Sequence, residues 1–85
     1  MSWTWEYVFG AEDAARTAPP DFLAEVERTA EELVRAAEAR YVHGRAYDGA
    51  DPRGGDIPIR GGMFRYQIVV RHERVHIVQI TYLGF

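Results

Sequence analysis

The sequence predicts a single α+β domain over residues 1–85, in which two helices pack on one face of a small, mainly antiparallel sheet. The first observation is the order of elements. An alternating aromatic segment precedes two helical segments, and three apolar segments of strand character follow, in the order β-α-α-β-β-β. The second observation is that both helices lie in one connection between strands, so they can cover only one face of the sheet. A chain of 85 residues forms one core, and the other face stays partly open.

The first expected element is a strand over residues 3–9 that ends at Gly10. Its aromatic side chains occupy every second position and therefore share one face. These residues are Trp3, Trp5, Tyr7 and Phe9. Such a face could stack nucleobases, but an aromatic strand face more often packs on helices, and we expect the second arrangement.

Residues 11–18 predict a short helix. The segment is rich in alanine and begins with acidic residues. It places Glu12 four residues before Arg16, a spacing that favours an ion pair on a helix. Pro19 and Pro20 then stop the helix, because proline cannot donate the backbone hydrogen bond that a helix interior requires.

The second helix is expected to run from these prolines to about residues 40–43. Asp21 lies in its first turn, where a negative charge interacts favourably with the helix dipole. Apolar residues then recur at three- and four-residue steps and form one stripe. The stripe consists of Phe22, Leu23, Val26, Ala30, Leu33, Val34, Ala37 and Tyr41. Gly44 is expected to cap the helix, and a charged His43 would favour its C-terminal end.

Residues 44–56 are rich in glycine and aspartate and predict a loop. A loop of this length in so small a domain is often a binding element, or becomes ordered only on a partner. Three strands are expected next, over residues 56–60, 63–71 and 74–83. Because these strands are consecutive and closely connected, they form an antiparallel meander.

Arg65 is the most informative residue of these strands. Strand alternation directs Phe64 and Tyr66 toward the helices and Arg65 toward the uncovered face. An arginine in that place is solvated, paired with a loop acid such as Asp56, or bound to a ligand. Other cations lie on the same face or at its margins: Arg60, Arg71, Arg74 and His76. A one-residue change of hairpin register would move His76 to the opposite face.

Composition excludes several classes of function. The chain has no cysteine, which removes disulfides, thiolate metal sites and thiol nucleophiles. Its three histidines lack further ligands at suitable spacing, so no metal and no cofactor are expected. No segment has the length and apolar character of a membrane span, and none resembles a signal peptide. We therefore expect a cytoplasmic protein with no membrane partner.

Charge divides the chain into two unlike halves. The net charge is −3, which disfavours nucleic acid as the main partner. Residues 1–40 carry four arginines and nine acids, a balance of −5, whereas residues 41–85 carry six arginines and four acids, a balance of +2. All ten cations are arginine, which suits planar recognition of carboxylate or phosphate. A GC-rich genome would produce the same bias.

The order of elements and the local sequence resemble the RelE/ParE superfamily of bacterial toxins, over nearly the whole chain. Members typically carry the segment I-x-L-R-x-x-G-x-Y-R-x-x-Y-x-V, then a short acidic turn and a valine-rich last strand. The matching residues are Ile57, Ile59 and Arg60, the pair Phe64-Arg65, then Ile68 and Val70, the turn Glu73-Arg74, and the strand from Val75 to Ile80.

The resemblance implies the toxin component of a bacterial type II toxin–antitoxin system. Its leading implication is a RelE-like mRNA interferase, a growth-inhibiting endoribonuclease that cuts mRNA on the ribosome without a metal. The catalytic residues would be Arg65, Arg60 and His76, and the substrate-binding residues Arg71, Arg74 and Tyr82. The expected partners are a cognate antitoxin protein and the ribosome with its mRNA.

Departures from the family's pattern keep two alternatives open. Met63 stands where the family has glycine, and Pro58 stands where RelE-like enzymes often carry lysine. The chain ends Leu83-Gly84-Phe85, where the family commonly has a cation. The first alternative is a ParE-like inhibitor that binds DNA gyrase without cutting. The second is a non-toxic relative that kept the fold as an interaction module.

Overall fold

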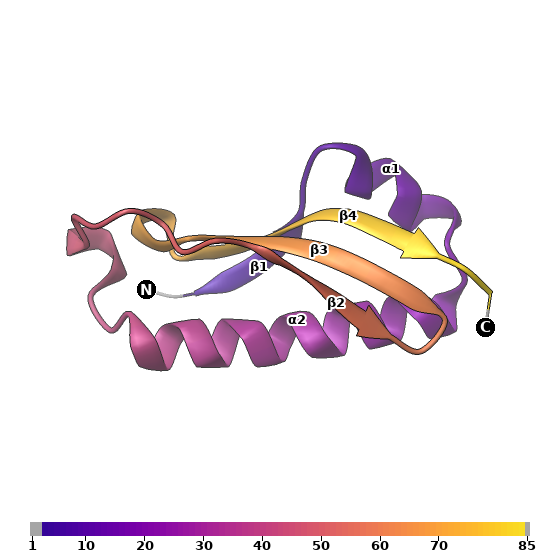
Figure 1. Cartoon of the computed structure of the whole chain (residues 1–85), viewed down its shortest axis with the longest axis horizontal. Coiled ribbons are helices and arrows are strands. Elements are labelled where there is room, and N and C mark those ends of the chain that lie inside the picture. The colour runs from indigo at the N-terminus through magenta and orange to yellow at the C-terminus, as the bar shows by residue number, and fades with distance from the viewer. Residues whose placement is uncertain (1–2, 85) are drawn as a thin grey trace.

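The computed structural model describes residues 3–84 and confirms the α+β class, with two helices and a four-stranded, mostly antiparallel sheet (Figure 1). The strands are β1 (Thr4–Tyr7), β2 (Gly55–Ile59), β3 (Gly62–Val69) and β4 (Arg74–Tyr82). The helices are α1 (Gly10–Thr17) and α2 (Pro20–Arg40), and the short 3-10 turns are η1 (Gly44–Ala46) and η2 (Val70–His72). The predicted order of elements is confirmed, and most bounds agree within two or three residues.

The sheet has the strand order β1-β4-β3-β2. The consecutive strands β2, β3 and β4 form the predicted antiparallel meander. β1 joins its edge parallel to β4, with Trp5 opposite Val75 and Tyr7 opposite Ile77. β1 covers only the first half of β4, and α1 lies beside the remaining half (Figure 1).

β1 ends where Phe9 adopts a φ of 55° and a ψ of −138°, which turns the chain into α1. The prediction that the aromatic face points to the helices is confirmed for Trp5 and Tyr7. Trp5 Nε1 and Tyr7 Oη donate hydrogen bonds to the α2 carboxylates of Glu31 and Glu27, at 3.0 and 3.1 Å. The prediction is wrong for Phe9, which is 79% exposed because the turn rotates it out of the strand.

α2 packs on one face of the sheet, whereas α1 lies beside β4 and adds Ala11 to the same core (Figure 1). α1 begins at Gly10, and Ala18 after it is extended. Its predicted Glu12–Arg16 pair is wrong, since Arg16 lies 3.2 Å from Asp13 instead. Both side chains of the observed pair are exposed, so it contributes little to stability.

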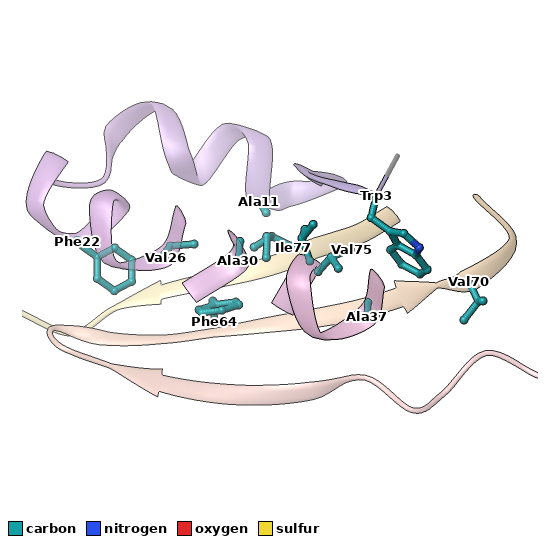
Figure 2. Packing of buried hydrophobic residues seen from close by; sticks show 11 residues of the cluster. Trp3, Ala11, Phe22, Val26, Ala30, Ala37, Phe64, Val70, Val75 and Ile77 are labelled. Atoms are coloured by element: carbon teal, nitrogen blue, oxygen red, sulfur yellow. The ribbon is translucent and has the colours of Figure 1, made fainter. Parts of the chain in front are cut away.

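α2 runs along the length of the sheet and buries the predicted apolar stripe against it (Figures 1 and 2). The helix contributes Phe22, Val26, Ala30, Val34 and Ala37 to the core. The remaining buried members are Trp3, Ala11, Phe64, Val70, Val75 and Ile77. Apolar side chains from both layers therefore leave water together, which is the main force that holds this fold.

The prediction that Gly44 caps α2 is wrong, because the helix ends at Arg40 and Gly44 begins η1. Gly44 instead packs against η2. A Cβ at this position would lie 2.8 Å from the backbone oxygen of Val70 and 2.9 Å from Cγ of Glu73. Glu73 has a left-handed φ of 54° and a buried side chain, with Arg45 Nε 3.3 Å from its Oε1. Sequence reasoning had placed Glu73 only in the turn before the last strand.

The predicted loop is tied to the end of β3. Gln67 Nε2 donates to the backbone oxygen of Pro52 at 3.0 Å, and the Val70 backbone N–H donates to Asp51 Oδ1 at 2.9 Å. This segment lies at the opposite end of the molecule from the β2–β3 turn (Figure 1). The β2 strand itself begins at Gly55, one residue earlier than predicted.

The side of the sheet that faces away from α2 is called the open face. Strand alternation assigns to it Thr4, Glu6, Asp56, Pro58, Met63, Arg65, Gln67, Val69, Arg74, His76, Gln79 and Thr81. The pairing register shifts once, between Arg65 opposite Gln79 and Tyr66 opposite Ile77, so that Val78 is an extra residue in β4. Such a bulge bends the strand and redirects a side chain.

Candidate binding face

Arg65 lies on the open face, where strand alternation had placed it. Its Nε donates to Asp56 Oδ1 at 2.7 Å and its Nη2 to Asp56 Oδ2 at 3.4 Å, across the β2–β3 pair. The hydrogen bond to Arg65 lowers the pKa of the Asp56 carboxyl, and the same bond raises the pKa of the guanidinium. Both side chains are exposed, so the pair remains accessible to a ligand.

His76 lies on the same face, directly opposite Gln67 of β3. The hairpin register is therefore the one that keeps it with Arg65. Its Nε2 lies 3.1 Å from Oε2 of Glu6 on the neighbouring strand β1. A base for the proton of a sugar hydroxyl needs a free nitrogen in reach of that hydroxyl, and here this nitrogen already faces a carboxylate.

Arg71 and Arg74 lie at the η2 end of the sheet. Arg71 is exposed in η2, so the prediction that it continues the strand face beside Arg65 is wrong. The 3-10 turn ends the alternation of β3 at Val69. Arg74 Nη1 donates to the backbone oxygens of His72 and Glu73, at 3.1 and 3.2 Å. These bonds make Arg74 a cap of the turn.

Arg60 and Tyr82 lie at the opposite end, beside the start of α2. Both line a hollow of about 520 Å3 together with Asp21 and Phe22. The Tyr82 ring packs edge-on against Phe22, with 5.2 Å between the ring centroids. Tyr82 is thus half-exposed and anchored on the core, and Arg60 is separated from Arg65 along the β2–β3 hairpin.

The predicted site residues therefore fall into three groups. The open face holds Arg65 and His76, the η2 end holds Arg71 and Arg74, and the α2 end holds Arg60 and Tyr82. On the open face Arg65 and His76 each lie against a carboxylate, whereas Arg74 donates to backbone oxygens. The charged side chains could therefore contact a partner at several separate points. They do not converge on one point, as a set of catalytic groups would.

Sequence reasoning missed a hollow of about 550 Å3 that crosses β4, β3 and β2 on the open face. Its lining consists of Phe9, Val78, Asp56, Arg65, Tyr66, Gln67 and the glycines at 54–55. The signal for Phe9 was the glycine after it, which marks a turn from strand to helix. No sequence signal marks Val78, because a bulge follows from the pairing of two strands and not from local composition.

Within residues 3–84 no group of histidine and acidic side chains has the geometry of a metal site. Among the helices described, none has both the length and the apolar character that crossing a bilayer requires. Comparison of this chain with protein-family models, with curated proteins and with solved structures finds no match.

Proposed function

We propose that this chain is a RelE/ParE-like toxin of a type II toxin–antitoxin module, and that it acts by binding a target protein through its open face. The sequence resemblance and the β-α-α-β-β-β order support the family. That the α+β fold is specifically a RelE/ParE-like fold is part of the proposal. An antitoxin would then neutralise the chain by covering the same face, and a protein such as DNA gyrase would be the target.

One observation carries the choice of binding over cutting: Arg65 and His76 of the open face each lie against a carboxylate. Cleavage of RNA without a metal needs cations on the scissile phosphate together with an acid and a base at one point. Asp56 and Glu6 place negative charge where the phosphate would sit. A partner protein can bind over such pairs, because its own charged side chains can form new ion pairs with Arg65 and Asp56 in place of the existing one.

Growth arrest tests the proposal. Expression of the wild type should stop bacterial growth, and Arg65→Ala should relieve the arrest while leaving the fold intact. Arg53→Ala is a matched control, since Arg53 is an exposed arginine of the loop outside the hollow. The binding mechanism predicts a DNA-damage response with intact mRNA. A wild type that never slows growth would refute the toxin assignment and leave the non-toxic interaction module.

A second candidate is the RelE-like mRNA endonuclease. It is favoured by one observation, that Arg65, Arg74 and His76 all belong to the open face. On this mechanism substrate binding would break the pairs with Asp56 and Glu6. The expected result is mRNA cleaved on ribosomes soon after induction, and loss of cleavage in His76→Gln. Intact ribosome-bound mRNA during growth arrest would contradict it.

A further inference from the structure

β1 leaves one edge of its backbone without a partner. The strand pairs only with β4 and ends the sheet. Thr4 and Val8 donate their backbone N–H groups to β4, at 3.2 and 3.0 Å. Successive strand residues direct their backbone groups to opposite sides, so Trp5 and Tyr7 direct theirs away from β4. Within residues 3–84 no strand, turn or loop backbone bonds to these outward groups, which we call the β1 edge.

The opposite edge of the sheet is blunted, whereas the β1 edge is not. β2 carries Pro58, which has no N–H and therefore interrupts the row of donors along that strand. β1 contains no proline, and α1 lies beside β4 only after β1 has ended (Figure 1). An exposed edge of this kind is a template for another strand. Only an extended polypeptide repeats N–H and C=O groups at the matching spacing, so the backbone chemistry identifies the class of ligand.

The side chains along the β1 edge are acidic. On the α2 side, Glu31 accepts a hydrogen bond from Trp5 Nε1 at 3.0 Å, and Glu27 accepts one from Tyr7 Oη at 3.1 Å. Both donors are neutral, and within residues 3–84 neither carboxylate forms an ion pair. The edge therefore carries two negative charges that the described part of the chain does not neutralise.

We propose that the β1 edge binds an extended basic segment of another protein, which adds to the four-stranded sheet as a further strand. In antiparallel addition, the two residues opposite Trp5 and Tyr7 exchange hydrogen bonds with them and point to the α2 side. Cations at these two positions, separated by one residue, form charge-assisted bonds with Glu27 and Glu31. The face of the Trp5 ring offers a cation a further favourable contact.

Charge selects this occupant over the other candidates. A nucleic acid would bring its phosphates to an acidic edge. A second copy of the chain would pair β1 with β1 and bring its own Glu6, Glu27 and Glu31 to the same edge, where like charges oppose pairing. His76 lies against Glu6 on the open face, but the Glu6 side chain remains half-exposed. The inference does not rest on the proposed function, because the β1 edge is separate from Arg65 and its hollow.

Three blocked peptides test the two parts of this recognition by NMR titration of the labelled full chain. The probe is acetyl-threonyl-arginyl-valyl-arginyl-threonyl-amide. One control replaces both arginines by glutamate, and the other keeps them but methylates their backbone nitrogens, which removes the N–H groups that would face Trp5 and Tyr7. We expect millimolar binding of the probe and at least about fivefold weaker binding of each control. Equal binding of the probe and either control, or no binding of the probe, overturns the proposal.

Amide hydrogen exchange reports the pairing residue by residue. In the free chain the N–H groups of Trp5 and Tyr7 should exchange at least about tenfold faster than that of Glu6, which the ladder directs to β4. Saturation with the probe should slow Trp5 and Tyr7 and leave Glu6 unchanged. Slow exchange of Trp5 and Tyr7 in the dilute free chain would show that the edge is not free and would overturn the proposal. Protection that grows with protein concentration alone would assign the edge to a second copy, and the proposal fails.

Substitutions test the charge of the edge without altering the strand. Glu27→Gln combined with Glu31→Gln removes both negative charges but keeps side-chain oxygens that accept the same hydrogen bonds. This double variant should bind the probe at least about fivefold more weakly. Glu12→Gln combined with Asp48→Asn changes the net charge equally at exposed acids of α1 and the loop, and it should leave probe binding unchanged. Equal weakening in both double variants would assign binding to net charge and overturn the proposal.

Growth arrest separates this inference from the proposed function. A chain that binds the probe at the β1 edge but never arrests growth refutes the toxin assignment and keeps the strand-addition site. A chain that arrests growth but does not bind the probe keeps the toxin assignment and overturns the strand-addition site.

Discussion

The two faces of the sheet differ in polarity and exposure, although the same strands supply both. The covered face is apolar and closed, with Phe64 and Ile77 almost completely buried under α2 (Figure 2). The open face carries the exposed Arg65–Asp56 pair and the half-buried His76 against Glu6, and an exposed aromatic, Phe9, stands at a strained turn beside it. Stability thus comes from one face, while the other is free to carry recognition, because substitutions at exposed positions cost little folding energy.

The largest expected effect follows from adjacent residues of β3 that point to opposite faces. Phe64→Ala should lower the free energy of unfolding by about 3–5 kcal/mol, since Phe64 is 1% exposed and its removal leaves a cavity. Met63→Ala, on the open face, should cost less than about 1 kcal/mol. Urea denaturation followed by circular dichroism measures both values. If Phe64→Ala does not fold, Phe64→Leu provides a milder test.

Equal losses for the Phe64 and Met63 variants would contradict the contrast between the faces. A chain of this length has a total stability of only about 4–13 kcal/mol. Phe64→Ala therefore removes a large fraction of it, whereas Met63→Ala leaves the fold intact for binding measurements.

The second effect concerns Gly62 at the start of β3, where the backbone lies close to β4. A Cβ on Gly62 would clash with the backbone oxygen of Thr81 and lie 3.1 Å from the Phe22 ring. Gly62→Ala should therefore force the hairpin away from β4 and destabilise by about 2–3 kcal/mol. Gly10→Ala is the matched control, because no atom lies within 4 Å of its added Cβ. A Gly62 variant as stable as the Gly10 variant would rule out this close approach.

The third effect lies where β1 meets α2. Burial, followed by the charge and hydrogen bond of Glu27, raises the pKa of Tyr7 above its ordinary value of 10.0. The folded state therefore holds this proton more tightly than the unfolded state, so stability is fully present below pH 10 and falls as pH rises through the raised value. Tyr7→Phe should lose about 1 kcal/mol at neutral pH and lose less stability than the wild type above pH 10.

Melting temperatures of both proteins between pH 8 and about pH 11.5, below the titration of arginine, measure this difference. Parallel loss in the wild type and Tyr7→Phe would show that another group is responsible. The result extends the comparison of the two faces to the edge of the covered face, where the Tyr7 hydroxyl bonds to a carboxylate of α2.

The covered face was largely predictable from the sequence, and the open face only in part. Periodicity identified the α2 stripe and the inward direction of Phe64, since burial imposes a regular pattern on the chain. Alternation also placed Arg65 outward, and a pair with Asp56 was one of the three alternatives considered for it. The position of Phe9 depends on one backbone dihedral, and that of Val78 on the register of two strands. Neither position can be predicted from the local amino-acid composition.

The smallest expected effect concerns the Arg65–Asp56 pair itself. Asp56→Asn should leave the melting temperature within measurement error, because both side chains are exposed and such pairs contribute little. The effect of the pair should instead be visible when the Asp56 carboxyl is titrated.

Because Arg65 lowers the pKa of the Asp56 carboxyl, the small stabilisation is present above the ordinary aspartate range and is lost as pH falls through the lowered value. Carboxyl NMR titration of the wild type should show Asp56 titrating below ordinary aspartates, and Arg65→Gln should return it to that range. An unchanged Asp56 titration in Arg65→Gln would break the pair on which the polar side of the hollow depends, and would leave Arg65 as a solvated arginine.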